Sequence, residues 1–320
     1  MTKTIPRSKE GVRYVEIDET REGQRLDNFL LGQLKGVPKS HVYRVLRRGE
    51  VRVNSGRVSP DYRLQSGDRI RIPPIRQGEP PRLANADRFV WLRERVLHED
   101  DDLLVLDKPA GLPVHSGSGV AVGVIEALRQ LCPELPMLDL AHRLDRDTSG
   151  CLLIVKRRSA LVKLHAMLRD GGVEKRYLAL VRGRWRGGRR RISAPLEQDR
   201  AKGGERRITT AAVGRAAESD FDPQGFFGPA TLMEVRLHTG RMHQARVHAV
   251  FAGHPIAGDE KYGERDFNRE LRSVGLRRLF LHAARLRFAH PTTGAKIDVI
   301  SPLPPELASV LERLRDKAAL

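Results

Sequence analysis

The chain has 320 residues, 40% of them hydrophobic, which is enough for two domains with separate cores. Two cysteines are too few for a disulfide scaffold or a zinc framework, and no apolar run approaches the length of a membrane span. Lysine and arginine (58) exceed aspartate and glutamate (40), so the net charge of +18 favours polyanionic partners such as nucleic acid. Residues 1–18 contain no apolar signal-peptide core, so we expect a cytoplasmic protein. We also expect that it needs no membrane and acts as a monomer.

Two amphipathic helices are predicted near the start of the chain. Residues 24–36 carry four apolar side chains at helical spacing, namely Leu26, Phe29, Leu30 and Leu34. A second helix fits Ser40 to Arg48, with Ser40 as its N-cap and Gly49 as the residue after its C-cap. Alternating apolar residues then predict short strands at 50–53 and 69–72.

The second of these helices has one apolar face and one basic face. Helical spacing turns Val42, Val45 and Leu46 inward and places Arg44, Arg47 and Arg48 on the opposite side. For this helix alone, an ordinary solvated surface explains the arginines as well as a binding surface does.

A segment rich in proline and polar residues follows, PPIRQGEPPRLANADRF. Such a composition is poor material for helices or strands and is typical of an interdomain linker. We therefore expect a small domain over residues 20–76, a linker over 77–96 and a larger domain over 97–320.

The larger part of the chain is predicted to be an α+β domain. Apolar runs predict buried strands at 103–106 and 151–155, and residues 175–181 predict a further strand. A helix is expected to begin near Ser159. The elements lack a regular strand–helix–strand rhythm, which favours a mixed, mostly antiparallel sheet.

The stretch HRLDRDTSG (142–150) packs opposing charges beside a turn. It fits a solvated surface loop, a metal site, or a carboxylate held ready by arginines. Its potential metal ligands are His142, Asp145 and Asp147, but Arg143 and Arg146 would repel a cation, so we expect no metal here. We interpret Asp147 as structural.

A second polar cluster, LHTGRMHQARVH (237–248), is rich in histidine. His243 and His248 are five residues apart, about 140° around a helix, and no HExxH pattern is present, which disfavours zinc. Helical spacing instead aligns His243 with Arg246 and Arg241 with Gln244. A Thr-Gly start followed by such donors predicts an anion-facing surface.

Together, these segments resemble the RluA/RluC family of pseudouridine synthases. The matching pieces are DKPAGLPVHSG (107–117), HRLDRDTSG (142–150), KRYLALVRG (175–183), TGRMHQARVH (239–248), HPIAGDEKYG (254–263) and LFLHAARLRFAHP (279–291). Residues 23–58 and 64–74 resemble the S4 RNA-binding domain. This arrangement is most similar to family members that act on large-subunit (23S) ribosomal RNA, whereas residues 192–230 match only loosely and are expected to hold a specificity loop.

The resemblance implies that uridine is isomerised to pseudouridine without a cofactor or metal. It assigns Asp145 as the essential carboxylate, which acts on ribose C1′ or assists formation of a glycal intermediate. It assigns Arg246 as the partner of Asp145. It assigns Tyr177 as a residue that stacks on the uracil and accepts the C5 proton. The expected RNA-binding residues are Arg143, Thr148, Arg241, Lys39, Arg44, Arg47 and Arg48. The expected partner is large-subunit ribosomal RNA or its precursor; transfer RNA as substrate, or a non-catalytic ribosome-assembly factor, remain alternatives.

Overall fold

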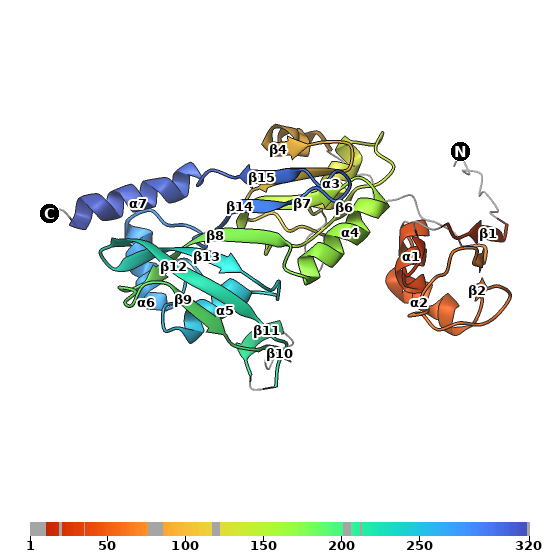
Figure 1. The fold of residues 1–320 in the computed structure, drawn as a ribbon, viewed down its shortest axis with the longest axis horizontal. Coiled ribbons are helices and arrows are strands. Elements are labelled where there is room, and N and C mark those ends of the chain that lie inside the picture. The colour runs from red at the N-terminus through yellow and green to blue at the C-terminus, as the bar shows by residue number, and fades with distance from the viewer. Residues whose placement is uncertain are drawn as a thin grey trace, which may run out of the picture. The chain divides into compact units, whose positions relative to one another are not determined.

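The computed structural model describes residues 11–18, 21–34, 36–75, 86–116, 122–200, 206–211 and 213–318. The chain separates into two compact units, Met1–Ala84 and Asn85–Leu320, each with its own hydrophobic core (Figure 1). Within the described ranges, no helix combines the length and the apolar character needed to span a bilayer.

The first unit packs two helices against a small antiparallel sheet. Its elements are β1 (Arg13–Glu16), α1 (Leu26–Gln33), α2 (Lys39–Arg47), β2 (Arg52–Val53) and β3 (Arg69–Ile72), with strand order β1-β3-β2. The predicted apolar stripes of both helices are buried in its core, together with Ile70 and Ile72 of β3. The basic side chains of α2 are exposed, as expected from their spacing.

The start of α2 differs from the prediction, whereas its end agrees. The helix begins at Lys39, so Ser40 lies inside it and Pro38 occupies the N-cap position without a side-chain cap. The carbonyl of Pro38 accepts the backbone N–H groups of His41 and Val42, so the proline itself opens the first turn. Gly49 follows the C-cap with a φ of 68°, a left-handed conformation that glycine adopts readily.

The second unit is built on a sheet of ten strands among the described residues. Eight form the order β4-β5-β7-β14-β8-β13-β12-β9, and β6 and β15 pair with β7 and β14. The strands are β4 (Val96–Glu99), β5 (Leu103–Lys108), β6 (Asp139–Leu140), β7 (Ser149–Val155), β8 (Val173–Arg182), β9 (Arg190–Ser193), β12 (Glu218–Phe227), β13 (Ala230–Leu237), β14 (Leu281–Ala289) and β15 (Lys296–Ile300). Only the pairing of β7 with β14 is parallel among these, so the predicted α+β fold with a mixed, mostly antiparallel sheet is confirmed.

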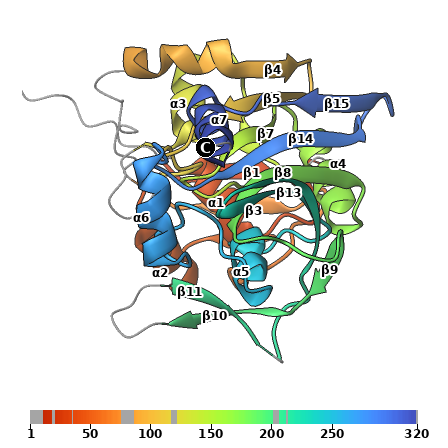
Figure 2. The ribbon, with the colours of Figure 1, turned by 90° about the vertical axis from the view of Figure 1, so that its left-hand side faces the viewer.

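Helices and a hairpin surround this sheet. The helical elements are the 3-10 helix η2 (Ala86–Arg95), α3 (Val124–Leu131), α4 (Arg158–Arg169), α5 (Gln244–Phe251), α6 (Arg265–Ser273) and α7 (Pro305–Ala318). The hairpin of β10 (Leu196–Arg200) and β11 (Arg206–Thr210) stands apart from the large sheet and lies beside α5 (Figures 1 and 2). It occupies part of the loosely matching region 192–230, of which 201–205 and 212 lie outside the described residues.

The central strands are apolar on both sides because both faces of the sheet are covered. Along β5, Leu104 and Leu106 enter a core shared with α3 and α5. Leu103 and Val105 point the other way, into a core shared with α4. Alternate residues of a strand face opposite sides, so a sheet covered twice requires the unbroken apolar runs seen in the sequence.

The expected linker differs from the structure over its second half. Residues 77–85 lie outside the described residues, but Ala86–Arg95 form η2, and Leu92 of this helix is fully buried against the large sheet's core. Phe89 also packs against this core, so the stretch belongs to the second unit.

Gly150 allows β7 and β14 to approach closely. It pairs with Ala283 in the parallel ladder and has a φ of 107°. A Cβ added there would lie 2.3 Å from the carbonyl oxygen of Ala283, a backbone atom that cannot turn away.

We therefore expect Gly150→Ala to lower the free energy of unfolding by about 2–4 kcal/mol, through backbone strain and overpacking together. Gly171→Ala is the matched control, because Gly171 is also left-handed but has open space around its Cβ position. It should cost only about 1 kcal/mol. Urea denaturation of both variants measures the difference, and equal losses would contradict the close-approach explanation.

Candidate active site

The loop between β6 and β7 is pinned by a buried lysine. Lys108 is fully buried, and its Nζ donates hydrogen bonds of 2.8–2.9 Å to the carbonyls of Pro109, Leu112 and Arg146. Burial lowers the pKa of Lys108 to about 7. The backbone N–H of Gly111 also donates to the Arg146 carbonyl, at 2.9 Å. Arg146, the residue after Asp145, is thus fixed to the end of β5.

His142 belongs to the framework of this loop. Its Nε2 accepts the backbone N–H of Leu153 at 3.1 Å. Burial and the nearby charge of Lys175 lower the pKa of His142 to about 4, so the ring is neutral at pH 7. Within the described ranges, no three His, Cys, Asp or Glu side chains gather as potential metal ligands.

Asp145 meets Arg246 across the site, although 101 residues separate them in the chain. Arg246 lies in α5 and donates from Nη1 to Oδ2 of Asp145 at 3.2 Å. Its Nε and Nη2 donate to both carboxylate oxygens of Asp259, at 2.7 and 2.8 Å. One guanidinium therefore bridges two carboxylates, with two hydrogen bonds to Asp259 and one to Asp145.

Asp259 is the buried end of this bridge. Its side chain is 1% exposed, against 18% for Asp145. Besides the guanidinium, it accepts the backbone N–H groups of Lys261 and Tyr262, both at 2.9 Å. Burial alone would raise the pKa of Asp259, but the Arg246 hydrogen bonds and charge lower it below its usual value, so Asp259 stays ionised.

Arg246 is fixed as a cation by the same contacts. Burial opposes its charge, but hydrogen bonds to Asp259 and the charges of Asp259 and Asp145 raise its pKa above the usual value. The guanidinium also lies over the ring of Tyr262, 4.9 Å from its centroid. Asp145 is consequently the accessible carboxylate of the group, facing a permanent positive charge.

The start of α5 differs from the helix expected over TGRMHQARVH. The helix begins at Gln244, and His243 precedes it in a left-handed conformation. The buried Gln244 accepts hydrogen bonds from Thr239 and from the backbone of Arg241, closing a turn instead of continuing the helix. The predicted alignment of Arg241 with Gln244 on one helical face is therefore wrong.

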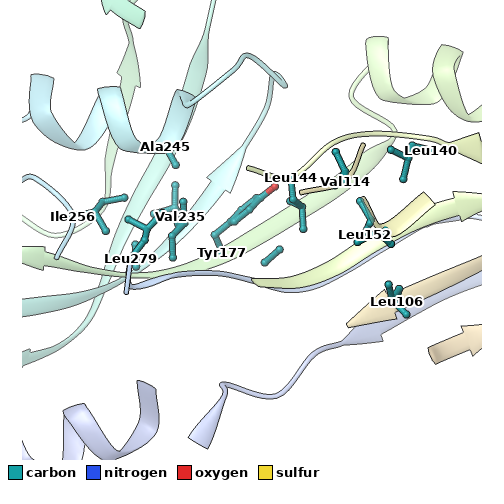
Figure 3. Close-up of a cluster of buried hydrophobic side chains, with 14 of the residues drawn as sticks. Leu106, Val114, Leu140, Leu144, Leu152, Tyr177, Val235, Ala245, Ile256 and Leu279 are labelled. Atoms are coloured by element: carbon teal, nitrogen blue, oxygen red, sulfur yellow. The ribbon is translucent and has the colours of Figure 1, made fainter. Parts of the chain in front are cut away.

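Tyr177 reaches the site from β8. Its ring belongs to the large core, and its hydroxyl oxygen points toward Leu144, the residue before Asp145 (Figure 3). Burial, followed by the charge of Asp145, raises the pKa of Tyr177 well above its usual value, so the phenol is protonated at neutral pH.

The other predicted site residues are dispersed. Arg143 and Arg241 are exposed, and Arg241 donates from Nε to the carbonyl of Ala216 at 3.1 Å. Thr148 is 2% exposed and its backbone N–H donates to the Asp145 carbonyl at 3.2 Å, so it shapes the turn and is not available to RNA. In the first unit, exposed basic residues line α2 as predicted: Lys39, Arg44, Arg47 and Arg48.

Sequence reasoning missed Lys108, Asp259 and Tyr262. All three lie in segments that match the family, DKPAG and HPIAGDEKYG, but no spacing rule pointed to them. For Lys108 the available signal was a charge at the end of an apolar run, and for Asp259 a charge directly after a glycine. Such a charge must find a partner when the flanking residues are buried.

His142 gives the structure a testable pH dependence. Its folded-state pKa lies below the usual value of 6.5, so the unfolded chain takes up a proton first as the pH falls. The stabilisation is complete above pH 6.5 and is lost toward pH 4. Relative to His142→Gln, whose amide oxygen can still accept the Leu153 N–H, the wild type should lose about 2 kcal/mol between pH 7 and pH 5. Urea denaturation measures the free energy of unfolding of both proteins at pH 7 and pH 5. An equal change in the two proteins would contradict this assignment.

Comparison with family models identifies both parts of the chain. Residues 102–250 match the model described as RNA pseudouridylate synthase, which covers Asp145, Tyr177 and Arg246. Residues 24–70 match the S4 domain.

Relatives and solved structures agree with these matches. Proteins called ribosomal large subunit pseudouridine synthase C are 50% identical in Yersinia pestis (97% of this chain, 98% of the relative) and 49% identical in Escherichia coli K12 (95% and 97%). The structure called human RNA pseudouridylate synthase domain containing 4 is 25% identical with a TM-score of 0.60, over 72% of this chain and 97% of that one. The chain therefore belongs to the RluA/RluC family of pseudouridine synthases.

Proposed function

We propose that this protein isomerises specific uridines of large-subunit ribosomal RNA to pseudouridine, without a cofactor, and that Asp145 is the essential catalytic residue. The observation that carries the proposal is the accessible carboxylate of Asp145, which faces a guanidinium anchored by the buried Asp259. The names of the relatives, ribosomal large subunit pseudouridine synthase C, support the choice of substrate.

The chemistry requires a group at the sugar. The C1′–N1 bond of uridine breaks, the uracil turns, a C1′–C5 bond forms, the C5 proton leaves and N1 ends protonated. Asp145 acts at ribose C1′ as a nucleophile, or assists formation of a glycal by accepting a sugar proton. Either role requires an ionised carboxylate, which the Arg246 guanidinium at 3.2 Å favours.

Tyr177 is proposed to stack on the uracil. Its ring is rigidly packed in the core, and an aromatic face suits an unstacked base. A proton-accepting role at C5 would need the phenolate, and the raised pKa of Tyr177 disfavours that form at neutral pH. Of the two roles that the resemblance implies for Tyr177, the raised pKa therefore favours stacking over proton acceptance.

RNA binding is assigned to the basic surfaces. The exposed arginines of α2, with Lys39, suit phosphate contacts, as do the exposed Arg143 and Arg241. The target uridine must leave its stack before Asp145 reaches it, at a cost of a few kcal/mol, and such contacts can supply that energy. We propose that the protein acts as a monomer in the cytoplasm, where ribosomal RNA or its precursor is available.

The proposal predicts release of tritium from ribosomal RNA transcripts labelled at uridine C5. The wild type should release it, and Asp145→Asn should reduce the rate by at least about 10³-fold, because the amide can neither attack C1′ nor accept a proton. Asp147→Asn is the matched control: the same change, two residues away, in a side chain that is 48% exposed and pairs only with Arg146 among the described residues. It should retain near-normal activity.

Three outcomes separate the alternatives. Equal release by wild type and Asp145→Asn would remove Asp145 from the mechanism. Tight ribosomal RNA binding without release would favour the assembly factor. Release from transfer RNA but not from ribosomal RNA would identify transfer RNA as the substrate and would leave the assignment of Asp145 unchanged.

A further inference from the structure

His243 is held in an unusual backbone conformation beside the catalytic carboxylate. Its φ is 55°, in the left-handed region that residues other than glycine seldom adopt. Such a conformation persists only where the surroundings enforce it, and it is concentrated at functional sites. In this case the conformation places the imidazole between Tyr262 and Asp145.

A chain of contacts fixes one side of the ring. Nδ1 of His243 lies 2.8 Å from the Tyr262 hydroxyl, and the two rings meet edge to face. The same hydroxyl accepts the backbone N–H of Ile208, in β11, at 3.0 Å. The hairpin thus reaches the imidazole through one tyrosine oxygen.

These contacts select a tautomer. Ile208 N–H can only donate, so the Tyr262 oxygen accepts it and keeps its own proton to donate to Nδ1. Burial lowers the pKa of His243, opposed by Asp145, so the ring is neutral at pH 7. A neutral ring that accepts at Nδ1 carries its proton on Nε2.

That proton faces the catalytic carboxylate. Nε2 of His243 is 3.8 Å from Oδ1 of Asp145, whereas Arg246 contacts Oδ2. The two oxygens of Asp145 therefore have different neighbours. Hydrogen bonds in active sites without substrate are often long and shorten when substrate binds.

We propose that His243 is a positioning residue: when RNA binds, its Nε2–H closes the 3.8 Å gap to Asp145 Oδ1, donates to that oxygen and sets the plane of the carboxylate toward the ribose. The β10–β11 hairpin supports it from behind, through Ile208 and Tyr262. The inference rests on the proposed function, because the carboxylate must have a reaction to perform. A purely structural role would need only the left-handed backbone and the contact with Tyr262.

Two substitutions separate these roles, because they keep different halves of the imidazole. His243→Asn keeps an atom near the Nδ1 position and suits the left-handed backbone, which asparagine tolerates well. His243→Gln places an N–H near the Nε2 position but suits that backbone less. A structural role predicts that the asparagine variant is the more active; a positioning role predicts the reverse.

The measurement is kcat for tritium release under saturating RNA, with the RNA dissociation constant and thermal midpoint of each variant. We expect the glutamine variant to retain kcat within about threefold and the asparagine variant to lose about 10- to 100-fold, with RNA affinity unchanged in both. Tyr262→Phe removes the hydroxyl but keeps the ring beside Arg246; combined with His243→Asn, it should cause no further loss.

The failures are distinguishable. An active wild type with the asparagine variant equal to or better than the glutamine variant would overturn the positioning role alone. An inactive wild type would overturn the proposed function and, with it, this inference. If the variants with the lower thermal midpoints were also those with the lower kcat, the loss of activity would reflect lost stability and would contradict the positioning role of His243.

Discussion

The site depends on a buried guanidinium shared by two carboxylates. Removing a charge from water is costly unless partners compensate it, and Asp259 compensates Arg246 with two hydrogen bonds in a position sealed from solvent. The backbone N–H groups of Lys261 and Tyr262 then stabilise Asp259 in turn. This leaves one guanidinium nitrogen for Asp145, whose own side chain is the accessible one. The carboxylate of Asp145, which we propose to be catalytic, thus has a fixed counter-charge while its side chain stays partly exposed.

The rest of the second unit holds the two sides of this contact in place. On one side, Lys108 ties the loop that carries Asp145 to the end of β5, and Gly150 lets the following strand pair directly with β14. On the other side, Gln244 closes the turn before α5 with hydrogen bonds to Thr239 and Arg241. Both anchors are buried polar groups with satisfied hydrogen bonds, which give a rigid geometry and leave little freedom to the loop.

Periodicity and composition predicted the elements but not the contacts between them. Burial of a helix or strand leaves a regular pattern of apolar residues in the sequence. The apolar stripes of α1 and α2 and the unbroken apolar runs of β5 and β7 are such patterns. Asp145 and Arg246 were paired only through resemblance to a family, because 101 residues separate them. Asp259 was missed for the same reason: its bond to Arg246 is tertiary and follows no helical or strand spacing. Errors at Ser40, at His243 and over 86–95 lie at element boundaries, where a proline, a left-handed residue and the buried Leu92 decided the local structure.

In the proposed reaction, Asp259 acts indirectly, by holding Arg246 against Asp145. The most direct measurement is single-turnover pseudouridine formation by Asp259→Asn, Arg246→Lys and the double variant, at saturating RNA. Each single substitution should slow the reaction about 100-fold, because the carboxylate loses its fixed position. The double variant should be little slower than either, because both changes break the same bridge. Multiplicative losses, or near-normal rates for Asp259→Asn in a folded protein, would contradict the account.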